Sequence, residues 1–267
     1  MTVGSNWISV GDLADGFAPE SNSLPLCFDL AGIPLKIVFE DETEQDLLIQ
    51  RDGDMLFLHR ESAPPASVRV TSLRPDLYFV DYLTITDSVT LLINRQTGQA
   101  LKIIGTLPTI DEASQSLLIR AQSGMPLTSV KVRFLAGHIA GMQTNNGFER
   151  TSDLVGKRIR YRYSPTELYE HIYLNDSFYT WHCLKGVEAG LADTDHCHYF
   201  KLQDQLYLFV WQEKIVPTLG VVTVDLAKNK TDGKIFGRSD FSSGIFSNFP
   251  VGAFVTFANY TPADLGA

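Results

Sequence analysis

An internal repeat is the feature of this sequence that most constrains its fold. The run DLAGIPLKIVF, from Asp29 to Phe39, aligns without gaps with DLVGKRIRYRY, from Asp153 to Tyr163, at an offset of 124 residues. A second pair recurs in the same order, because LYFVDY from Leu77 to Tyr82 matches LYLFVW from Leu206 to Trp211. Two motifs that recur in order predict a duplicated structural unit. We expect one domain over residues 1–145 and another over residues 146–267, joined through the polar stretch 142–150.

Each half consists of short alternating runs separated by turn residues. In the first half these runs include LKIVFE, MLFLHR, SVRVTSL, DLYFVDYL, VTLLIN and SVKVRFLA, with RDGD, SAPPAS and NRQTGQ between some of them. Such spacing predicts antiparallel strands rather than alternating strands and helices. A closed barrel removes the exposed edges of so small a sheet, and barrels of about eight strands hold one ligand. One helix is expected within residues 108–123, capped by Asp111.

Composition and charge restrict the class of function. The chain has 267 residues, 44% of them hydrophobic and 20% charged, which indicates a globular protein. Its net charge of −9 argues against nucleic acids and anionic membranes as partners. No membrane-spanning stretch or secretion signal is recognised, so a cytoplasmic protein is expected. Cys27, Cys183 and Cys197 lack the spacing of a zinc ribbon and are interpreted as reduced thiols.

Alternation along two strands of the second half predicts a polar group of side chains inside the barrel. In KRIRYRY, Tyr161 and Tyr163 share one face, and three arginines occupy the other, which cannot line a small lumen unpaired. In LYLFVWQE, Glu213 shares a face with three aromatic residues, although both faces of this strand are apolar. If that face lines the lumen, burial raises the pKa of Glu213 and suits it to proton transfer.

The first half lacks these polar groups at the equivalent positions. Ile37 and Phe39 stand where the second half has the two tyrosines, and Thr84 stands where it has Glu213. Core packing with satisfied hydroxyls is the alternative explanation of a tyrosine pair. Packing alone does not require two hydroxyls and a carboxyl together in one barrel, so the comparison favours a functional site in the second half.

The second half resembles the molybdenum cofactor biosynthesis protein F (MoaF) family. The resemblance rests on YTWHCLKGVEAGLADTDHCHYFKL, LYLFVWQEKIVPTLGVVTVDL and DGKIFG, is dense from Gly156 to Gly237, and weakens over the first half. The family name does not indicate the chemistry. The sequence has neither a cysteine array for a metal nor a glycine-rich phosphate loop.

A more distant resemblance, to bacterial phenolic acid decarboxylases, implies the fold and a mechanism. Those enzymes are single calycin-like, that is lipocalin-like, barrels, so the resemblance implies an all-β chain of two tandem barrels of this kind. Their paired tyrosines and glutamate correspond by motif position to Tyr161, Tyr163 and Glu213. Further matching segments are Gly156, YEHIY from Tyr169, Lys185 with Gly186, Lys201 with Leu202, and Trp211 with Gln212.

One departure from the decarboxylases concerns the substrate. They carry an arginine after a glycine turn that orients the substrate carboxylate, whereas this chain has Leu191 after Gly190. A guanidinium is the natural bidentate partner of a carboxylate, so its loss argues against a carboxylate substrate. Lys185 or Lys214 would be less directional replacements.

The histidines offer two further interpretations. His182, His196 and His198 lie close in sequence to Asp193 and Asp195, and also to Cys183 and Cys197. A metal site needs at least three convergent ligands, and no third ligand is obvious by spacing, so no metal is expected. A catalytic pair of His182 with Asp193 or Asp195 is a second alternative, and ordinary hydrogen-bonded histidines are the simplest.

These observations predict a cofactor-independent enzyme of the lyase type that acts on a small aromatic or conjugated molecule inside the second barrel. Glu213, Tyr161 and Tyr163 are the expected catalytic residues. The expected substrate-binding residues are Tyr169, Tyr173, Trp181, His182, His196, Tyr207, Phe209 and Trp211. The alternative is a non-catalytic carrier with the same aromatic wall. A homo-oligomer is left open.

Overall fold

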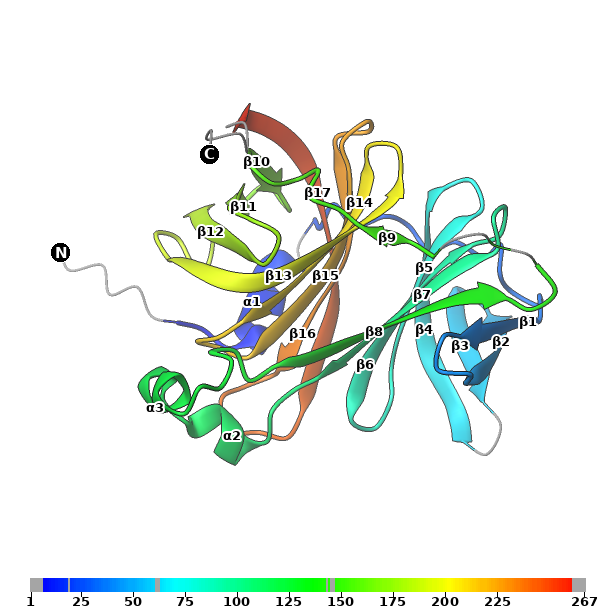
Figure 1. Cartoon of the computed structure of the whole chain (residues 1–267), viewed down its shortest axis with the longest axis horizontal. Helices are drawn as coiled ribbons and strands as arrows, with labels where there is room; N and C mark the ends of the chain where they lie inside the picture. The colour runs from blue at the N-terminus through cyan, green and yellow to red at the C-terminus, as the bar shows by residue number, and fades with distance from the viewer. Residues whose placement is uncertain (1–6, 19, 61–62, 143, 145–146, 261–267) are drawn as a thin grey trace. The chain divides into compact units, whose positions relative to one another are not determined.

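The computed structural model describes residues 7–18, 20–60, 63–142, 144 and 147–260. Most of them form antiparallel strands in two separate sheets (Figure 1). The first sheet is a closed barrel in which the strands follow one another in chain order. Its strands are β1 (Leu35–Phe39), β2 (Glu44–Asp52), β3 (Met55–Arg60), β4 (Ala63–Arg74), β5 (Leu77–Leu83), β6 (Asp87–Asn94), β7 (Gln99–Thr106) and β8 (Lys131–Ile139).

The second sheet also closes on itself. Its last strand pairs with its first long strand, and the ring is completed by pairing between β12 and β13. The short strand β9 adds to the outer edge of β13. The strands are β9 (Glu149–Arg150), β10 (Lys157–Arg162), β11 (Leu168–Tyr173), β12 (Phe178–Lys185), β13 (Ala192–Gln203), β14 (Leu206–Glu213), β15 (Thr218–Asp225), β16 (Lys230–Arg238) and β17 (Phe246–Tyr260).

The two barrels have the same connectivity, as the internal repeat predicts. β1 and β10 carry the first repeated motif and are the first long strands of their barrels. β5 and β14 carry the second motif, and each follows its barrel's first long strand by four strands. The predicted all-β fold of two tandem barrels is therefore confirmed.

The compact units do not follow the expected division at residue 145. One unit contains residues 24–106 and 132–149, and the other contains residues 150–267 together with 1–23 and 107–131. Two segments from the first part of the chain thus belong with the second barrel. Residues 143, 145 and 146 of the expected linker lie outside the described residues.

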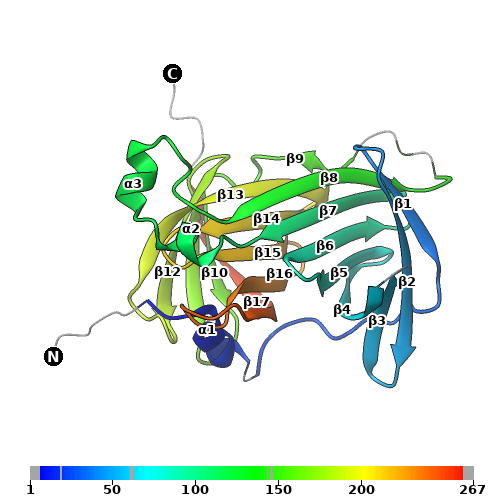
Figure 2. The same cartoon turned by 90° about the horizontal axis from the view of Figure 1, so that it is seen from below.

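The N-terminal segment forms helix α1 (Val10–Phe17), which the sequence analysis did not predict. Ser9 caps the helix by accepting a hydrogen bond from the Asp12 backbone, and Leu13 and Phe17 are buried on one face. This pattern is that of an amphipathic helix that needs a partner surface. α1 packs against β16 and β17, at one end of the second barrel (Figure 2).

The helix expected in residues 108–123 is present as two short helices. These are α2 (Ile110–Ser114) and α3 (Leu117–Gln122). Thr109, not Asp111, caps α2, because its hydroxyl accepts from the Glu112 backbone while the Glu112 carboxylate accepts from the Thr109 backbone. The segment that follows braces β14, because the Thr128 hydroxyl donates to the backbone oxygen of Glu213 at 3.2 Å. No helix among the described residues is long and apolar enough to cross a membrane.

Candidate functional site

The first strand of the second barrel turns its tyrosines inward. Tyr161 and Tyr163 are 1% and 4% exposed. On the outer face, Arg158 and Arg160 both donate to Glu170, at 2.6 and 3.0 Å. The arginines therefore neutralise a buried carboxylate on the outside of the barrel. Because side chains alternate along β10, the tyrosines point into the lumen.

β14 presents its aromatic face to the same interior. Tyr207, Phe209 and Trp211 belong to one core cluster with Tyr161 and Tyr163. The ring of Phe209 stacks on that of Trp211, with 5.1 Å between centroids. Alternation then carries Glu213 to the same side, at the end of the strand, where its carboxylate accepts from the Trp211 indole at 2.8 Å.

A cavity of about 30 Å³ lies beside Glu213 at the end of the second barrel covered by α1. A space of this size holds about two water molecules. Six aromatic side chains, two carboxyl groups, one imidazole and two aliphatic side chains form its wall: Phe17, Tyr163, Tyr169, Tyr179, Trp181, Trp211, Glu188, Glu213, His171, Leu13 and Ile235. Among the described residues, this wall contains no lysine and no arginine.

Glu213 is a carboxyl group that favours its protonated form. Burial raises its pKa well above the ordinary value of 4.5, and repulsion from Asp195 and Glu188 raises it further. The indole bond from Trp211 opposes this shift without reversing it. A protonated carboxyl beside an aromatic cavity can donate a proton to a bound molecule and take it back.

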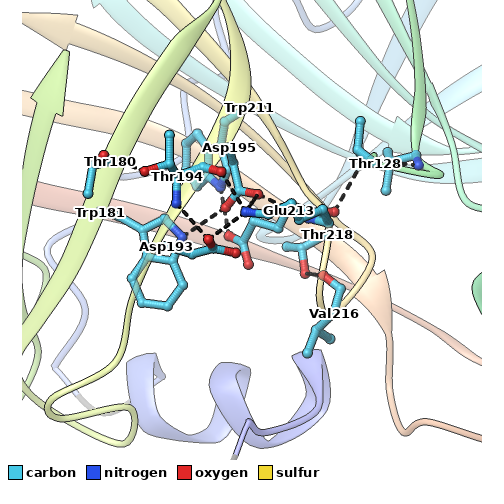
Figure 3. A network of polar contacts seen from close by, with 12 residues as sticks. Thr128, Thr180, Trp181, Asp193, Thr194, Asp195, Trp211, Glu213, Val216 and Thr218 are labelled. Carbon is cyan, nitrogen blue, oxygen red and sulfur yellow. Dashed lines mark hydrogen bonds and ion pairs between the residues drawn. The ribbon is translucent and has the colours of Figure 1, made fainter. Parts of the chain in front are cut away.

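A polar network at the ends of β13 and β14 holds this region together (Figure 3). Asp195 is 1% exposed and accepts from the Trp181 indole at 3.0 Å and from the Lys214 backbone at 3.1 Å. The Lys214 ammonium lies 2.5 Å from Asp193 and 3.3 Å from Asp195. One lysine thus serves two aspartates, and it leaves Glu213 and Glu188 without a cationic partner among the described residues.

The loop between β12 and β13 brings Glu188 to the cavity. Gly186 has a φ of 140°, and a Cβ there would lie 1.9 Å from the Glu167 carboxylate, so only glycine fits. The Glu188 carboxylate accepts from the Tyr169 hydroxyl at 3.0 Å. Burial raises the pKa of Glu188 to about 7.

Three further polar groups border the cavity. Within the described residues, the hydroxyls of Tyr163 and Tyr179 have no hydrogen-bond partner, although their side chains are 4% and 1% exposed. His171 is 4% exposed, and its Nδ1 has no hydrogen-bond partner among the described residues. Burial lowers its pKa to about 3. Buried polar groups are normally hydrogen-bonded, so these groups are available to a ligand.

The structure brings five of the expected residues to the cavity and places the others elsewhere. The five are Tyr163, Tyr169, Trp181, Trp211 and Glu213. Tyr161 and Tyr173 hydrogen-bond to each other at 2.5 Å, and Tyr207 bonds to Asp153 at 3.1 Å, so these hydroxyls are already paired. Phe209 packs between Tyr199 and Trp211 in the core.

The expectation that His182 and His196 line the pocket does not hold. Strand alternation places Tyr179, Trp181 and Cys183 inside the barrel and His182 on the opposite face of β12. His196 likewise alternates with the buried residues of β13, and its ring lies 3.3 Å from the Gln212 side-chain oxygen. His198, the third histidine of this segment, also hydrogen-bonds to the Gln212 side chain.

Several cavity residues were not predicted from the sequence. His171 lies on the same face of β11 as Tyr169 and Tyr173, and Tyr179 lies on the same face of β12 as Trp181, so parity alone could have found them. Glu188 lies in a loop, where no periodicity applies. Leu13 and Phe17 come from α1, far away in sequence, and no local signal connects them with the second barrel.

Gly220 allows Trp211 to lie against β15. The two residues are directly opposite each other, and a Cβ at position 220 would lie 2.1 Å from the Trp211 ring. Gly220→Ala is therefore expected to lower the free energy of unfolding by about 1–3 kcal/mol through overpacking. Urea unfolding measures this change, and Gly244→Ala, where a Cβ meets nothing within 4 Å, is the matched control. An unchanged midpoint for Gly220→Ala would contradict the close approach.

A second, larger hollow of about 190 Å³ is found elsewhere on the same unit. Ile110, Ile215 and Phe241 form its apolar rim, and all three are exposed. Arg238 also lines it, but donates to the backbone oxygens of Ser243 and Pro108 at 3.0 and 2.7 Å. None of the expected site residues borders this hollow.

The first barrel has a different interior. Ile37 and Phe39 are buried in an apolar cluster, and the Tyr82 hydroxyl accepts from Gln45 at 2.9 Å. Thr84, which stands where the second barrel has Glu213, hydrogen-bonds within a turn to Asp87. The cavity with its carboxyl groups is therefore a feature of the second barrel's sequence and not of the shared fold.

Comparison with known proteins identifies the family. Residues 148–261 match the family model described as the MoaF C-terminal domain, and residues 5–109 match the MoaF N-terminal domain. The chain is 44% identical over 266 residues to Protein MoaF of Klebsiella aerogenes, which covers 98% of both chains. A crystal structure from Burkholderia vietnamiensis, provisionally described as a beta-lactamase, has 16% identity and a TM-score of 0.34, and covers 41% of this chain and 100% of its own. The two family models and the full-length relative together show that this chain belongs to the MoaF family.

Proposed function

We propose that the chain is a cofactor-independent enzyme of the lyase type, which acts by general acid–base chemistry on a small aromatic or conjugated molecule in the second barrel. The observation that supports this most strongly is Glu213, a carboxyl group with a raised pKa beside an aromatic cavity. Perturbed titratable groups in cavities are typical of acid–base sites.

Three polar groups of the cavity have roles in this proposal. Glu213 transfers the proton, because its protonated form is favoured and its carboxyl borders the cavity. The hydroxyls of Tyr163 and Tyr179 donate hydrogen bonds to a substrate oxygen as charge develops on it. Tyr161 acts behind Tyr163, because its ring stacks on that of Tyr163 with 6.3 Å between centroids and its hydroxyl is bound to Tyr173. Tyr161 is therefore a positioning residue.

Substrate entry requires α1 to move in this proposal. The cavity of about 30 Å³ holds a small group only. The ring of Phe17 lies 4.8 Å from that of Tyr163 and 5.6 Å from that of Tyr169, so it fills the space that an aromatic substrate would need. Displacement of Phe17 and Leu13 would open the cavity without any change in the barrel.

The charge of the cavity bears on the type of reaction. The described residues of its wall include no lysine or arginine. Leu191, which stands where the decarboxylases have arginine, is 7% exposed within the apolar core. A substrate carboxylate would meet two carboxyl groups there. This favours an acid–base reaction related to decarboxylation over the decarboxylation of an anionic substrate.

A carrier without catalysis is the second candidate, and the buried aromatic wall supports it equally. A panel of uncharged phenols, with the anionic hydroxycinnamates as a comparison, separates the two, with binding followed by tryptophan fluorescence and turnover by chromatography. The proposal predicts both binding and turnover. Binding without turnover of any compound would favour the carrier.

Two matched variants test the role of Tyr163. Tyr163→Phe removes a hydroxyl that has no partner among the described residues and is expected to weaken substrate binding by about 0.5–1.5 kcal/mol, the worth of one neutral hydrogen bond. Tyr161→Phe removes a hydroxyl bound to Tyr173, so it should lower stability and leave binding nearly unchanged. Dissociation constants and urea unfolding of both variants measure the difference. Equal losses of affinity would contradict the assignment of Tyr163 to the cavity.

A further inference from the structure

We propose that the cavity of the second barrel binds an organic cation, an ammonium group attached to an aromatic body, with the ammonium between Glu188 and Glu213. This inference rests on the proposed function of the same cavity and names the chemical class of its ligand. It concerns binding alone and specifies no further reaction step.

The first support is the imbalance of charge. Glu188 and Glu213 border the cavity, and Asp193 and Asp195 lie behind it, against a single lysine. Lys214 contacts both aspartates and neither glutamate among the described interactions. An ammonium group would pair with the ionised carboxylate of Glu188 and donate a charge-assisted hydrogen bond to the carboxyl oxygen of Glu213.

The second support is the aromatic wall. Tyr169 and Trp181 have ring centroids 6.4 Å apart, and Tyr179 and Trp211 have centroids 6.0 Å apart. The faces of tryptophan and tyrosine rings attract cations, and aromatic cages built from them recognise quaternary ammonium ligands. The neutral His171, which is 4% exposed and has an unpaired Nδ1 in the described part of the chain, adds a polar group without adding positive charge.

The size of the cavity and the position of Phe17 agree with a ligand of two parts. The open space of about 30 Å³ fits a group about as large as two water molecules, such as an ammonium head group. Phe17 already places a phenyl ring against Tyr163 and Tyr169, beside this space. A phenyl group two carbons away from an ammonium could take the place of the Phe17 side chain.

Binding of a cation is expected to be coupled to loss of a proton from Glu188. Around Glu188 lie Tyr169, which donates to it, Cys183 and the carboxyl of Glu167. Around Glu213 lie Asp193, Asp195, Trp211 and the hydroxyls of Tyr163 and Tyr179. α1 contributes only Leu13 and Phe17 to the cavity, and β16 only Ile235. No cation therefore competes with the ligand among the described cavity residues.

The direction of the pH dependence follows. Burial raises the pKa of Glu188 to about 7, so the carboxylate must lose a proton to pair with the ammonium. Below that pKa, the affinity for the ammonium ligand should increase by up to about tenfold for each unit of pH increase, because one proton is released on binding. An anionic ligand would show the opposite trend.

The experiment compares three ligands of similar size on the full chain by calorimetry and tryptophan fluorescence from pH 6 to 8. These are 2-phenylethylammonium, 2-phenylethanol and phenylacetate. We expect the ammonium to bind at least ~10-fold more tightly than the alcohol at pH 8, as a charge-assisted bond implies, and phenylacetate to bind most weakly. Glu188→Gln should remove at least ~10-fold of the ammonium affinity and flatten its pH dependence. It should leave the alcohol unaffected, and the exposed Asp176→Asn should change neither ligand.

The outcomes separate this inference from the proposed function. Phenylacetate binding as tightly as the ammonium, or ammonium affinity that falls as pH rises, would overturn the inference while the acid–base site remains. Binding of none of the three ligands would count against the cavity itself and hence against both. If Glu188→Gln does not fold, the pH dependence of the wild type still decides the matter.

Discussion

Glu213→Gln is expected to lower turnover by ~10²–10⁴-fold, the usual contribution of a positioned acid or base. Glutamine has the shape of the protonated glutamic acid that burial favours at this position, and it can still accept the bond from the Trp211 indole. Affinity for uncharged ligands should therefore change little. Steady-state turnover and dissociation constants, measured on the same samples, test both parts of this prediction.

The same variant should also change the pH dependence of stability. The pKa of Glu213 is raised in the folded state, so the folded state holds a proton that the unfolded state loses above about pH 4.5. Wild-type stability from this group is full below that pH and declines as pH rises toward the folded pKa. Glu213→Gln should remove this decline and gain stability relative to wild type at alkaline pH. If the free energies of unfolding of the wild type and of Glu213→Gln changed with pH in parallel, this would contradict the burial of a neutral carboxyl group.

Asp195→Ala is expected to give the largest loss of stability in the site, about 3–5 kcal/mol. Its carboxylate, 1% exposed, accepts from the Trp181 indole and pairs with Lys214. Removal leaves a buried indole N–H unpaired, and it leaves the partly buried Lys214 ammonium with Asp193 as its one remaining carboxylate partner among the described residues. Urea unfolding measures the loss, and Thr194→Ala, an exposed neighbour on the same strand, should stay within about 0.5 kcal/mol of wild type.

A second consequence of Asp195→Ala concerns Glu213. Repulsion from Asp195 is, after burial, the largest cause of the raised pKa of Glu213. Its removal should shift the pH profile of turnover to lower pH, which a merely structural role would not produce. A profile that stays in place while stability falls would show that the two carboxyl groups are not coupled.

The sequence predicted the architecture because duplication and alternation are visible along the chain. The offset between β1 and β10 placed both first long strands, and the three arginines of β10 decided which face was buried. Alternation put Glu213 on the same face of β14 as Tyr207, but both faces of this strand are apolar, so the sequence left open which face lines the lumen. The structure shows that the aromatic face lies inside.

The remainder of the site depends on contacts between distant segments. α1 packs on β16 and β17 although more than two hundred residues separate it from them, and its eight residues give no sign of that partner. Glu188 reaches the cavity through a glycine-dependent loop, which has no period to read. His182 and His196 were attractive as chemical groups, but parity excluded them, and the same count applied to β11 would have pointed to His171 instead.

Proton transfer by Glu213 can be measured directly as exchange with solvent. The full chain is incubated in heavy water with uncharged aromatic and conjugated compounds, and deuterium on their carbon atoms is followed by nuclear magnetic resonance and mass spectrometry. The account predicts incorporation at the carbon that receives the proton with the wild type, and a loss of ~10²–10⁴-fold in its rate with Glu213→Gln. Equal incorporation by both proteins, or none with either while the compounds bind, would contradict an acid–base role for Glu213.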